Sequence, residues 1–427
     1  MHNALVLLVQ LIAVGGNDIM SSIFSKKSVH AQNLILELDP LADKLSKKGR
    51  KIVRLNRGDP PRFFPTPKYI IDAYVKALRS GATYYTKSQG VSELVDAVIG
   101  RYSRLYKMKL REEDIITTAG VSEALLFTNS ALINSGDRAV IFAPYYPQYI
   151  PRLMIEGGSP LIGNMVMKND WDTDFDGLSR KLRMMNGNRK TVKYIITTNP
   201  HNPTGKVVER KALKELVNLA NDNGILLISD EIYDEIVYNG KKFTSIGEVS
   251  KGVPHMIFNG SSKNLDSTGF RIGFMIIPEN DRISEGLKKK FSQYALVRLS
   301  LNTPSEYAVA EAMNNTKEHM KAIRSMTNAI EKRVNFAVDL LRENPYITVT
   351  RPSGAFYILP KLDMKSFNFK SSRDFVVSAL METGVQMTGG YSFGAPSNFR
   401  IAALPPEETL EYAINRVNSF CLKHAKK

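Results

Sequence analysis

The segment from residue 259 to 273, NGSSKNLDSTGFRIG, holds side chains that could do covalent chemistry beside a bound anion. Lys263 follows two serines, and Arg271 comes eight residues later. The preceding run HMIFNG is apolar and ends at a glycine, which is typical of a buried strand. A lysine amine can bond covalently to an aldehyde, and an arginine can grip a phosphate with two hydrogen bonds. Taken alone, Lys263 could equally be an ordinary solvated lysine, so the rest of the chain has to decide.

Polar side chains also follow other apolar runs that are typical of strands. Such runs lie at 114–120, 138–144, 193–200, 224–233, 255–260 and 271–278. Tyr146 follows the second run and Asn202 follows the third, while Asp230 and Tyr233 lie within the fourth. Ligands of open α/β sheets bind beyond the carboxyl ends of the strands, so we expect these side chains and the lysine at one edge. A buried carboxylate there would need a cation, which Lys263 or a ligand could supply.

An anion site is expected where the first of these runs ends. The strand ends at Gly120, and a helix is predicted to begin near Val121. Backbone amides at a helix N-terminus bind anions, and the Ser122 hydroxyl could add a donor. With Arg271, the site would combine an anion cradle, an aromatic wall, a carboxylate and a lysine. Pyridoxal phosphate, a phosphorylated aromatic aldehyde with a ring nitrogen, would use all four, and Lys263 would be its covalent partner.

The chain pattern around these residues predicts an α/β fold. Apolar runs alternate with amphipathic stretches such as 209–224, which has leucines at helical spacing and ends in a glycine. This alternation favours a largely parallel sheet. From about residue 301 the pattern becomes helical, with a long helix expected over 318–345 and short strands within 346–360. We therefore expect a second, smaller domain.

Composition excludes several classes of function. The 427 residues carry a formal net charge of +16, but the positive residues are scattered and no zinc-finger or aromatic RNA-binding pattern occurs, so no nucleic-acid partner is expected. The six histidines show no HExxH spacing, and no metal site is expected. The single cysteine, Cys421, cannot form an intrachain disulfide, which fits a reducing compartment such as the cytoplasm.

The N-terminus carries an apolar run at 4–14 that is too short to span a bilayer. It could be the apolar part of a signal peptide, but no Lys or Arg precedes it and no A-x-A site follows. Met20 could instead be the natural start, with residues 1–19 an extension. We favour an extension or a frayed segment over secretion, and we expect no membrane partner.

Eight motifs in order connect the chain with a known family. They are NRGDPP (56–61), YYTKSQG (84–90), AGVSEAL (119–125), PYYPQY (144–149), NPHNPTG (199–205), SDEIYDE (229–235), SSKNLDSTGFRIG (261–273) and NFRIA (398–402). From about residue 29 the chain resembles the class I/II aminotransferases of pyridoxal-phosphate fold type I. The segments NGSSK (259–263) and RLSLNTP (298–304) most resemble archaeal-type alanine/aspartate aminotransferases.

The resemblance implies a domain layout. A large cofactor-binding domain over 67–300 would hold a mostly parallel seven-stranded sheet flanked by helices. Residues 301–427 would form a smaller α+β domain. Residues 23–66 would form an N-terminal arm and part of that small domain, and residues 1–22 would be an extension that need not be native.

The resemblance also implies roles for individual residues. Lys263 would form the internal aldimine and move protons, with Asp230 on the pyridine nitrogen and Tyr233 as the third catalytic residue. The cofactor-binding residues would be Gly120, Val121, Ser122, Tyr146, Asn202, Asp230, Tyr233, Ser261, Ser262, Lys263, Arg271 and Tyr85. Tyr85 would reach the phosphate of the neighbouring subunit, which implies a homodimer with shared active sites.

Substrate recognition is less well defined. Arg400 would clamp the α-carboxylate beside Gly58 and Asn202. Arg298, with strand-like neighbours, is a candidate for a distal carboxylate, although a structural role is at least as compatible with its sequence setting. Two departures from the family pattern stand out. Gly260 replaces a usual serine, for which Ser261 could compensate, and Gly389-Gly390 predicts a looser loop near the substrate.

The expected function is a pyridoxal-phosphate-dependent aminotransferase. Alanine or aspartate would give its amino group to a 2-oxo acid, with 2-oxoglutarate as the expected acceptor, by a ping-pong mechanism. The alternatives are another enzyme of this fold, such as a C–S lyase, a decarboxylase-like variant or an aromatic/kynurenine-type aminotransferase, and a non-catalytic amino-acid sensor. A sensor usually carries a DNA-binding domain, which the first twenty-odd residues cannot form.

Overall fold

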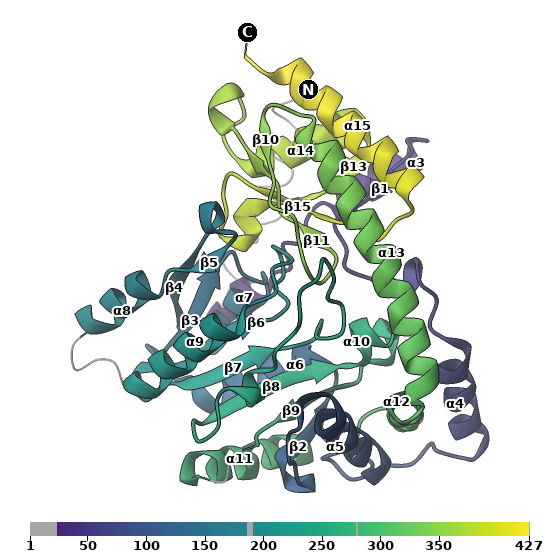
Figure 1. Cartoon of the computed structure of the whole chain (residues 1–427), viewed down its shortest axis with the longest axis vertical. Coiled ribbons are helices and arrows are strands. Elements are labelled where there is room, and N and C mark those ends of the chain that lie inside the picture. Colours follow the sequence, from purple (N-terminus) through teal and green to yellow (C-terminus); the bar gives the residue numbers. More distant parts are fainter. Residues whose placement is uncertain (1–23, 186–190, 279–280, 427) are drawn as a thin grey trace.

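The central element of the protein is an eight-stranded sheet, seen in a computed structural model that describes residues 24–185, 191–278 and 281–426 (Figure 1). Its strands follow one another across the sheet in the order β2 (Ile115–Thr118), β9 (Gly273–Ile276), β8 (His255–Gly260), β7 (Leu226–Asp230), β6 (Val192–Thr198), β3 (Arg138–Ala143), β4 (Ser159–Val166) and β5 (Asp172–Thr173). All six predicted strand segments are present. The sequence analysis did not predict β4, whose run SPLIGNMV mixes proline and glycine with apolar residues.

The sheet is mostly parallel, as expected. The neighbours β8, β7, β6, β3 and β4 pair in parallel. Strand β9 runs antiparallel to both β2 and β8. The sheet has eight strands where seven were expected, because the chain turns back through Asp170 and Trp171, at φ 51° and 62°, into the two-residue β5. The prediction of a mostly parallel α/β sheet is thus confirmed, and β5 is its addition at one edge.

Helices cover both faces of the sheet. Side chains of α6 (Val121–Leu132), α7 (Tyr149–Ile155) and α11 (Arg282–Arg298) pack on one face. Those of α5 (Ser92–Tyr106), α8 (Phe175–Met184), α9 (Arg210–Asn223) and α12 (Thr303–Asn314) pack on the other, with α4 (Lys68–Arg79) against α12. Helix α9 buries Leu213, Leu216, Val217 and Ala220 and ends before Gly224, as its amphipathic pattern predicted. Because the strands are covered on both sides, they are continuously apolar.

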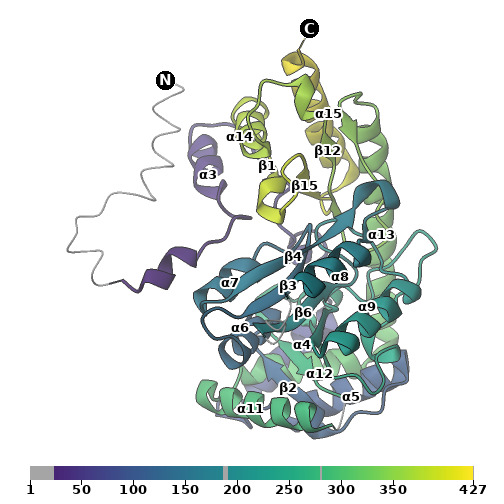
Figure 2. The ribbon, with the colours of Figure 1, turned by 90° about the vertical axis from the view of Figure 1, so that its left-hand side faces the viewer.

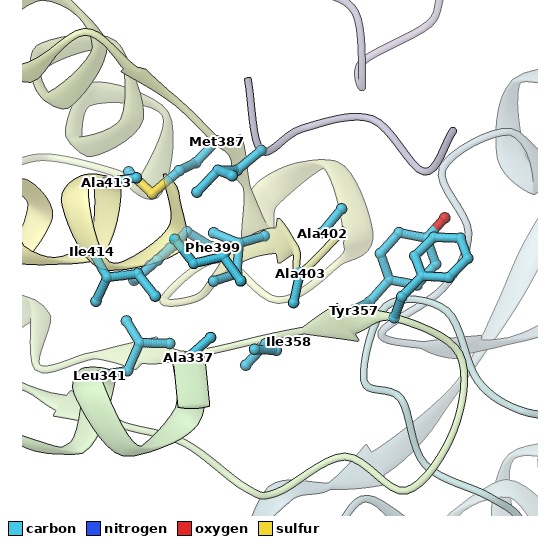
Figure 3. Packing of buried hydrophobic residues seen from close by; sticks show 14 of the residues in the cluster. Ala337, Leu341, Tyr357, Ile358, Met387, Phe399, Ala402, Ala403, Ala413 and Ile414 are labelled. Atoms are coloured by element: carbon cyan, nitrogen blue, oxygen red, sulfur yellow. The ribbon is translucent and has the colours of Figure 1, made fainter. Parts of the chain in front are cut away.

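The small domain lies beyond one end of this sheet (Figure 1). Its helices are α3 (Asp39–Lys47), α13 (Thr316–Arg342), α14 (Ser372–Thr383) and α15 (Glu407–His424). Its strands are β1 (Val53–Arg54), β10 (Ile347–Thr348), β11 (Tyr357–Ile358), β12 (Lys361–Leu362), β13 (Val385–Gln386), β14 (Thr388–Gly389) and β15 (Phe399–Ala402). Figure 3 shows the buried core, in which α13 and α15 meet β11 and β15, and Tyr357 lies on the side away from Leu341 and Ile414.

The N-terminal arm contacts both domains. Strand β1 pairs in parallel with β13 of the small domain. The turn η1 (Lys26–His30) lies beside α7 (Figure 2), and Gln148 Nε2 donates to Gln32 O at 3.1 Å. These contacts support the expected arm over 23–66, which stays a prediction at its boundaries.

The division expected at residue 300/301 also stays a prediction, and the packing favours a later boundary. The buried side chains of α12 belong to the core of the large sheet. Helix α13 then runs from the large domain to the small one (Figure 1). We therefore propose a boundary near Asn315, between these two helices.

In the part of the chain that the structure describes, no helix is long and apolar enough to cross a membrane. The apolar run at 4–14 and the choice between Met1 and Met20 lie outside the described residues.

Candidate active site

Lys263 lies directly after the end of a central strand. Strand β8 ends at Gly260, and the short helix α10 (Ser261–Asn264) carries the lysine on its first turn. The side chain enters a cavity of about 230 Å³, where its Nζ donates to Gly58 O at 2.7 Å. Most of the predicted site residues line this cavity, namely Gly58, Val121, Ser122, Tyr146, Asn202, Asp230, Tyr233, Ser262, Lys263, Arg271 and Arg400.

The environment of Lys263 favours a reactive amine. Burial lowers the pKa of Lys263 to about 8, although the Asp59 carboxylate opposes this shift. The Arg271 and Arg400 guanidinium groups lower the pKa further. A substantial fraction of the amine is therefore neutral near physiological pH, and only the neutral amine can attack an aldehyde carbon.

Asp230 lies at the end of β7 and is almost fully buried. Its carboxylate accepts hydrogen bonds from Tyr149 Oη at 2.9 Å and from Ile232 N at 3.3 Å. Burial raises the pKa of Asp230 to about 6. Lys263 donates to Gly58 O and not to Asp230, and no salt bridge to Asp230 occurs among the described residues. The cation that this carboxylate needs is thus to be supplied by a ligand.

The anion cradle forms at the N-terminus of α6. Gly120 precedes the helix at φ 73°, and a Cβ there would lie 2.5 Å from Arg271 Nη2, so a glycine is required for this approach. Arg271 donates to Ala119 O at 3.0 Å and to Thr268 O at 3.1 Å. The guanidinium is therefore fixed beside the free amides of the first helical turn, an arrangement that binds a phosphate.

Arg400 forms the opposite end of the cavity. It lies on β15, is 1% exposed, and donates to Asn202 Oδ1 at 2.9 Å and to Asn56 O at 2.6 Å. Its guanidinium carbon lies 4.4 Å from the ring centroid of Tyr357 and 4.7 Å from that of Phe393. Its Nε is buried and makes no hydrogen bond to the described residues. A buried arginine held between two aromatic rings can grip a carboxylate with a fixed orientation.

Two neutral donors converge between these ends. Tyr233 Oη lies 3.1 Å from Tyr357 Oη, and Asn202 Nδ2 lies 3.5 Å from Tyr233 Oη. Burial raises the pKa of Tyr146 to about 12, so the ring that lines the cavity is neutral. Gly58 is required here because a Cβ would lie 1.9 Å from Tyr357 Oη.

Besides Gly120, which lies behind Arg271, three predicted site residues do not line this cavity. Ser261 Oγ lies buried and donates to Ile272 O at 3.3 Å, so it does not compensate for the absence of a serine hydroxyl at Gly260. Arg298 is the last residue of α11 and not part of a strand, and it donates to Ser88 O and Thr117 O. Arg298 does not line the cavity of its own subunit, and its role at a distal carboxylate stays a prediction. Tyr85 is 80% exposed, so its contact with a neighbouring subunit stays a prediction.

The segment Gly389-Gly390, where a looser loop was expected, is hydrogen-bonded along its backbone, and its mobility relative to other family members stays a prediction. Gly389 belongs to β14, which pairs with β15. Gly390 N donates to Asn398 O at 2.6 Å, and Gly390 O accepts from Ala395 N at 2.9 Å. Backbone pairing holds this segment without the usual proline.

The family of the chain follows from comparison with known proteins. The sequence model of the family Aminotransferase class I and II matches residues 50–417. The chain belongs to this family. It is an aminotransferase, as the resemblance predicted.

Similar proteins cover nearly the whole aminotransferase. An asparagine–oxo-acid transaminase of Streptococcus mutans is 31% identical over 397 residues, which are 92% of this chain and 97% of the relative. A glutamate-pyruvate aminotransferase of Haemophilus influenzae is 31% identical over 380 residues, 88% of this chain and 92% of the relative. The solved alanine aminotransferase of Pyrococcus furiosus has a TM-score of 0.89 at 33% identity, covering 94% of this chain and 100% of that one.

Aminotransferases of this class and fold depend on pyridoxal phosphate, and the cavity fits that cofactor. The phosphate would lie at the α6 N-terminus beside Arg271, where a side chain at Gly120 would collide. Asp230, which forms no salt bridge with the described residues, would face the ring nitrogen. Lys263 would reach the aldehyde. The residues present thus match the phosphate, the ring nitrogen and the aldehyde of the cofactor.

Two further residues of the aminotransferase site, Tyr149 and Tyr357, were not predicted from the sequence. Tyr149 follows Tyr146 by three residues and opens α7, so its place in the PYYPQY motif was a usable signal. Tyr357 comes from β11 in the small domain. No local pattern marks it, because it reaches the cavity through domain packing.

Proposed function

We propose that this aminotransferase transfers the amino group of alanine or aspartate to a 2-oxo acid in two half-reactions, with 2-oxoglutarate as the common acceptor. The observation that carries the proposal is the convergence of Lys263, Asp230, Arg271 and Arg400 on one cavity. Its ends carry one arginine each, which suits a cofactor phosphate at one end and a substrate carboxylate at the other.

Each residue has a stated task in this proposal. The bound cofactor supplies an electron sink for the electrons released at the substrate α-carbon. Lys263 Nζ takes the proton from that carbon and returns it to the cofactor side. Asp230 holds a proton at the ring nitrogen, and Tyr233 Oη with Asn202 Nδ2 orients the ring hydroxyl. Arg400 binds the α-carboxylate and places the α-carbon within reach of Lys263.

The charges in the cavity suit the single carboxylate of alanine, whereas the second carboxylate of aspartate or 2-oxoglutarate needs a further donor. Among the described cavity-lining residues, the cations are Lys263, Arg271 and Arg400. The aldehyde, the phosphate and the α-carboxylate would engage all three. Among the described cavity-lining residues, no further cation remains for a distal carboxylate, so aspartate as donor and 2-oxoglutarate as acceptor would each need neutral donors or a residue of a second subunit. Similar proteins are named both as alanine or glutamate-pyruvate aminotransferases and as aspartate aminotransferases, which is why both amino donors are included in the proposal.

A homodimer is part of the proposal. Tyr85 is 80% exposed, and Leu296, Val297 and Leu299 near it are also exposed. The segment that carries Tyr85 lies against the end of α11, because Arg298 donates to Ser88 O. A second copy covering this apolar surface would bring Tyr85 to the partner's phosphate. The single, buried Cys421 supports a place in the cytoplasm.

Spectroscopy with defined amino donors tests the proposal. Alanine, aspartate or glutamate is added in turn to the cofactor-loaded enzyme, and the visible band of the bound cofactor is followed. Loss of the band with alanine, and its return with a 2-oxo acid, is expected. With cysteine as a further donor, release of ammonia and a sulfide while the band persists without any 2-oxo acid would identify a C–S lyase type of reaction. No spectral change with alanine, aspartate or glutamate would contradict the proposed amino donors.

A further inference from the structure

Asp59 connects two segments that border the cavity, those of Gly58 and Thr268. Its Oδ1 accepts a hydrogen bond from Thr268 Oγ1 at 2.7 Å, and its Oδ2 accepts from Arg62 Nε at 2.6 Å. Thr268 lines the cavity, and its carbonyl fixes Arg271. Asp59 itself follows Gly58, whose carbonyl accepts from Lys263 Nζ at 2.7 Å. The carboxylate therefore links the segment that touches the lysine to the loop that carries the phosphate-binding arginine.

The segment 56–59 contacts three functional elements within four residues. Asn56 O accepts from Arg400, Gly58 O accepts from Lys263, and Asp59 accepts from Thr268. The first two contacts use backbone carbonyls, which any sequence could offer. The last contact uses the charged side chain of Asp59, so it depends on the residue type at this position.

On the basis of the proposed function, we propose that Asp59 is a positioning residue. Its carboxylate anchors residues 56–59 on Thr268 so that the Gly58 carbonyl stays on the Lys263 amine, and its negative charge favours the ammonium form whenever that amine is free.

The charges around Lys263 support this role. Three carboxylates act on the lysine, those of Asp59, Asp230 and Asp266, and two guanidinium groups oppose them, those of Arg271 and Arg400. Burial lowers the pKa of the lysine, and the largest opposing effect comes from Asp59, ahead of Asp230. Asp230 is already held by Tyr149 and Ile232.

Asp59 stays ionised over the working range of pH. Burial favours its neutral form, but hydrogen bonds from Thr268 and Arg62 outweigh burial and lower the pKa of Asp59. The charges that face it are Arg62 and Lys263. The negative charge is thus a permanent feature of the site, and the proton on Lys263 is the one that moves.

This arrangement matters when Lys263 acts as an acid and a base. A free lysine amine has to hold a proton long enough to deliver it and then take up the next one. A fixed carbonyl and a nearby carboxylate hold that proton on Nζ and keep the nitrogen in place. Without the charge, Nζ loses its proton at a lower pH, and without the anchor its position varies.

The test measures the lysine directly in full-length protein without cofactor. Labelling of Lys263 by trinitrobenzenesulfonate is followed against pH, with the site read by mass spectrometry. Asp59→Asn keeps an acceptor for Thr268 and removes the charge, so the labelling midpoint is expected to fall by about 0.5–1 pH unit, a roughly threefold to tenfold change in proton affinity. Asp59→Glu restores the charge and is expected to return the midpoint toward that of the wild type.

A second variant separates the anchor from the charge. Thr268→Val removes the hydrogen bond and keeps the carboxylate, so faster labelling with little change in midpoint is expected. In the loaded enzyme, Asp59→Asn is expected to lower kcat more than it raises KM and to move the acid limb of the kcat pH profile. Asp72→Asn, which breaks an exposed pair with Lys68 at 2.6 Å, is the matched control and should change none of these quantities.

If the pH midpoint of Lys263 labelling were unchanged in Asp59→Asn, the proposed role of the Asp59 charge would be wrong. If Lys263 were labelled at the wild-type rate in Thr268→Val, the proposed anchoring of residues 56–59 on Thr268 would be wrong. Both readouts use neither cofactor nor substrate. They therefore stand even if alanine proves not to be the amino donor, so a failure of the proposed function can be told from a failure of this inference.

Discussion

Arg400 Nη1 donates to Asn202 Oδ1 at 2.9 Å, and this hydrogen bond joins the small domain to the large one. Arg400 lies on β15, and Asn202 follows β6. The residue expected to bind the substrate carboxylate thus also fixes the amide expected to orient the cofactor ring. Substrate binding at Arg400 would be felt by the cofactor through Asn202.

Arg400→Lys is expected to lower kcat/KM by a similar factor for every amino donor. A lysine cannot give two parallel hydrogen bonds or stack between Tyr357 and Phe393. We expect kcat/KM to fall by about 2–4 kcal/mol, roughly 30- to 1000-fold, while the visible spectrum of the cofactor persists. Steady-state kinetics with alanine and aspartate measure this, and Arg416→Lys on α15 serves as control. Wild-type kcat/KM in Arg400→Lys would exclude a carboxylate role.

Lys263→Ala is expected to remove the covalent and proton-transfer steps together. Activity should fall by a factor of roughly a thousand or more, about 4 kcal/mol of transition-state stabilisation. Borohydride reduction of the loaded wild-type enzyme should fix the cofactor on Lys263, as peptide mass spectrometry would detect. The exposed Lys290 provides the control substitution Lys290→Ala. Turnover by Lys263→Ala at the wild-type rate would refute the assignment.

The fold and the chemical centre could be predicted because their signals are local. A strand, a turn and a helix start are each encoded within about ten residues, so Asp230, Lys263 and the α6 N-terminus follow from the sequence pattern. Tyr357 and Arg298 depend on packing between segments far apart in the chain. The strand-like setting expected for Arg298 was wrong, because its helix α11 ends in residues that also suit a strand.

The contact of Asp59 with Thr268 could not be predicted from the sequence for the same reason. Asp59 lies in the recognised NRGDPP motif, but nothing in that motif tells that its carboxylate faces Thr268, 209 residues later. Strand β4 was missed for a related reason. Its own residues indicate a strand only weakly, and its pairing with β3 in the sheet determines its conformation.

Asp230→Asn is expected to stabilise the cofactor-free protein at neutral pH. Burial raises the pKa of Asp230 from 3.8 to about 6, so folding favours the protonated carboxyl. Ionising this buried carboxyl therefore destabilises the folded state. The free-energy cost is absent below the unfolded-state pKa of 3.8, grows between pH 3.8 and about 6, and is complete above about pH 6. Melting temperatures should show the variant above the wild type by roughly 1–3 °C at pH 7.5, with a smaller difference toward pH 4.

The same variant should lose cofactor affinity, because its amide cannot balance a protonated ring nitrogen. Asp72→Asn should show no comparable dependence on pH. If the melting-temperature difference between Asp230→Asn and the wild type grew as the pH fell, it would have the wrong sign. That result would contradict the burial of this carboxylate without a salt-bridge partner.

Arg298→Ala is expected to affect alanine and glutamate equally. The guanidinium contacts Ser88 O and Thr117 O and lies 3.7 Å from Glu123, so its loss should loosen the segment near Tyr85. Kinetics with both donors should give a ratio of kcat/KM values within about twofold of the wild type, together with a lower melting temperature. A selective loss for glutamate and aspartate would return Arg298 to the substrate site.

Trp171, the only tryptophan of the chain, is expected to hold the β4–β5 hairpin on the small domain. It is 5% exposed and packs with Leu359 and Ala395, and its Nε1 donates to Thr350 Oγ1 at 2.9 Å. Trp171→Ala should destabilise the protein by about 3–5 kcal/mol, because it leaves a cavity between the domains. Thr350→Val keeps the packing and should cost about 1 kcal/mol, the contribution of one hydrogen bond. Unfolding followed by far-ultraviolet circular dichroism compares the two variants without using the tryptophan signal. Equal destabilisation by the two substitutions would mean that the hydrogen bond, and not the packing, holds the hairpin. If Trp171→Ala left the free energy of unfolding unchanged, the hairpin would not contribute to the contact between the domains.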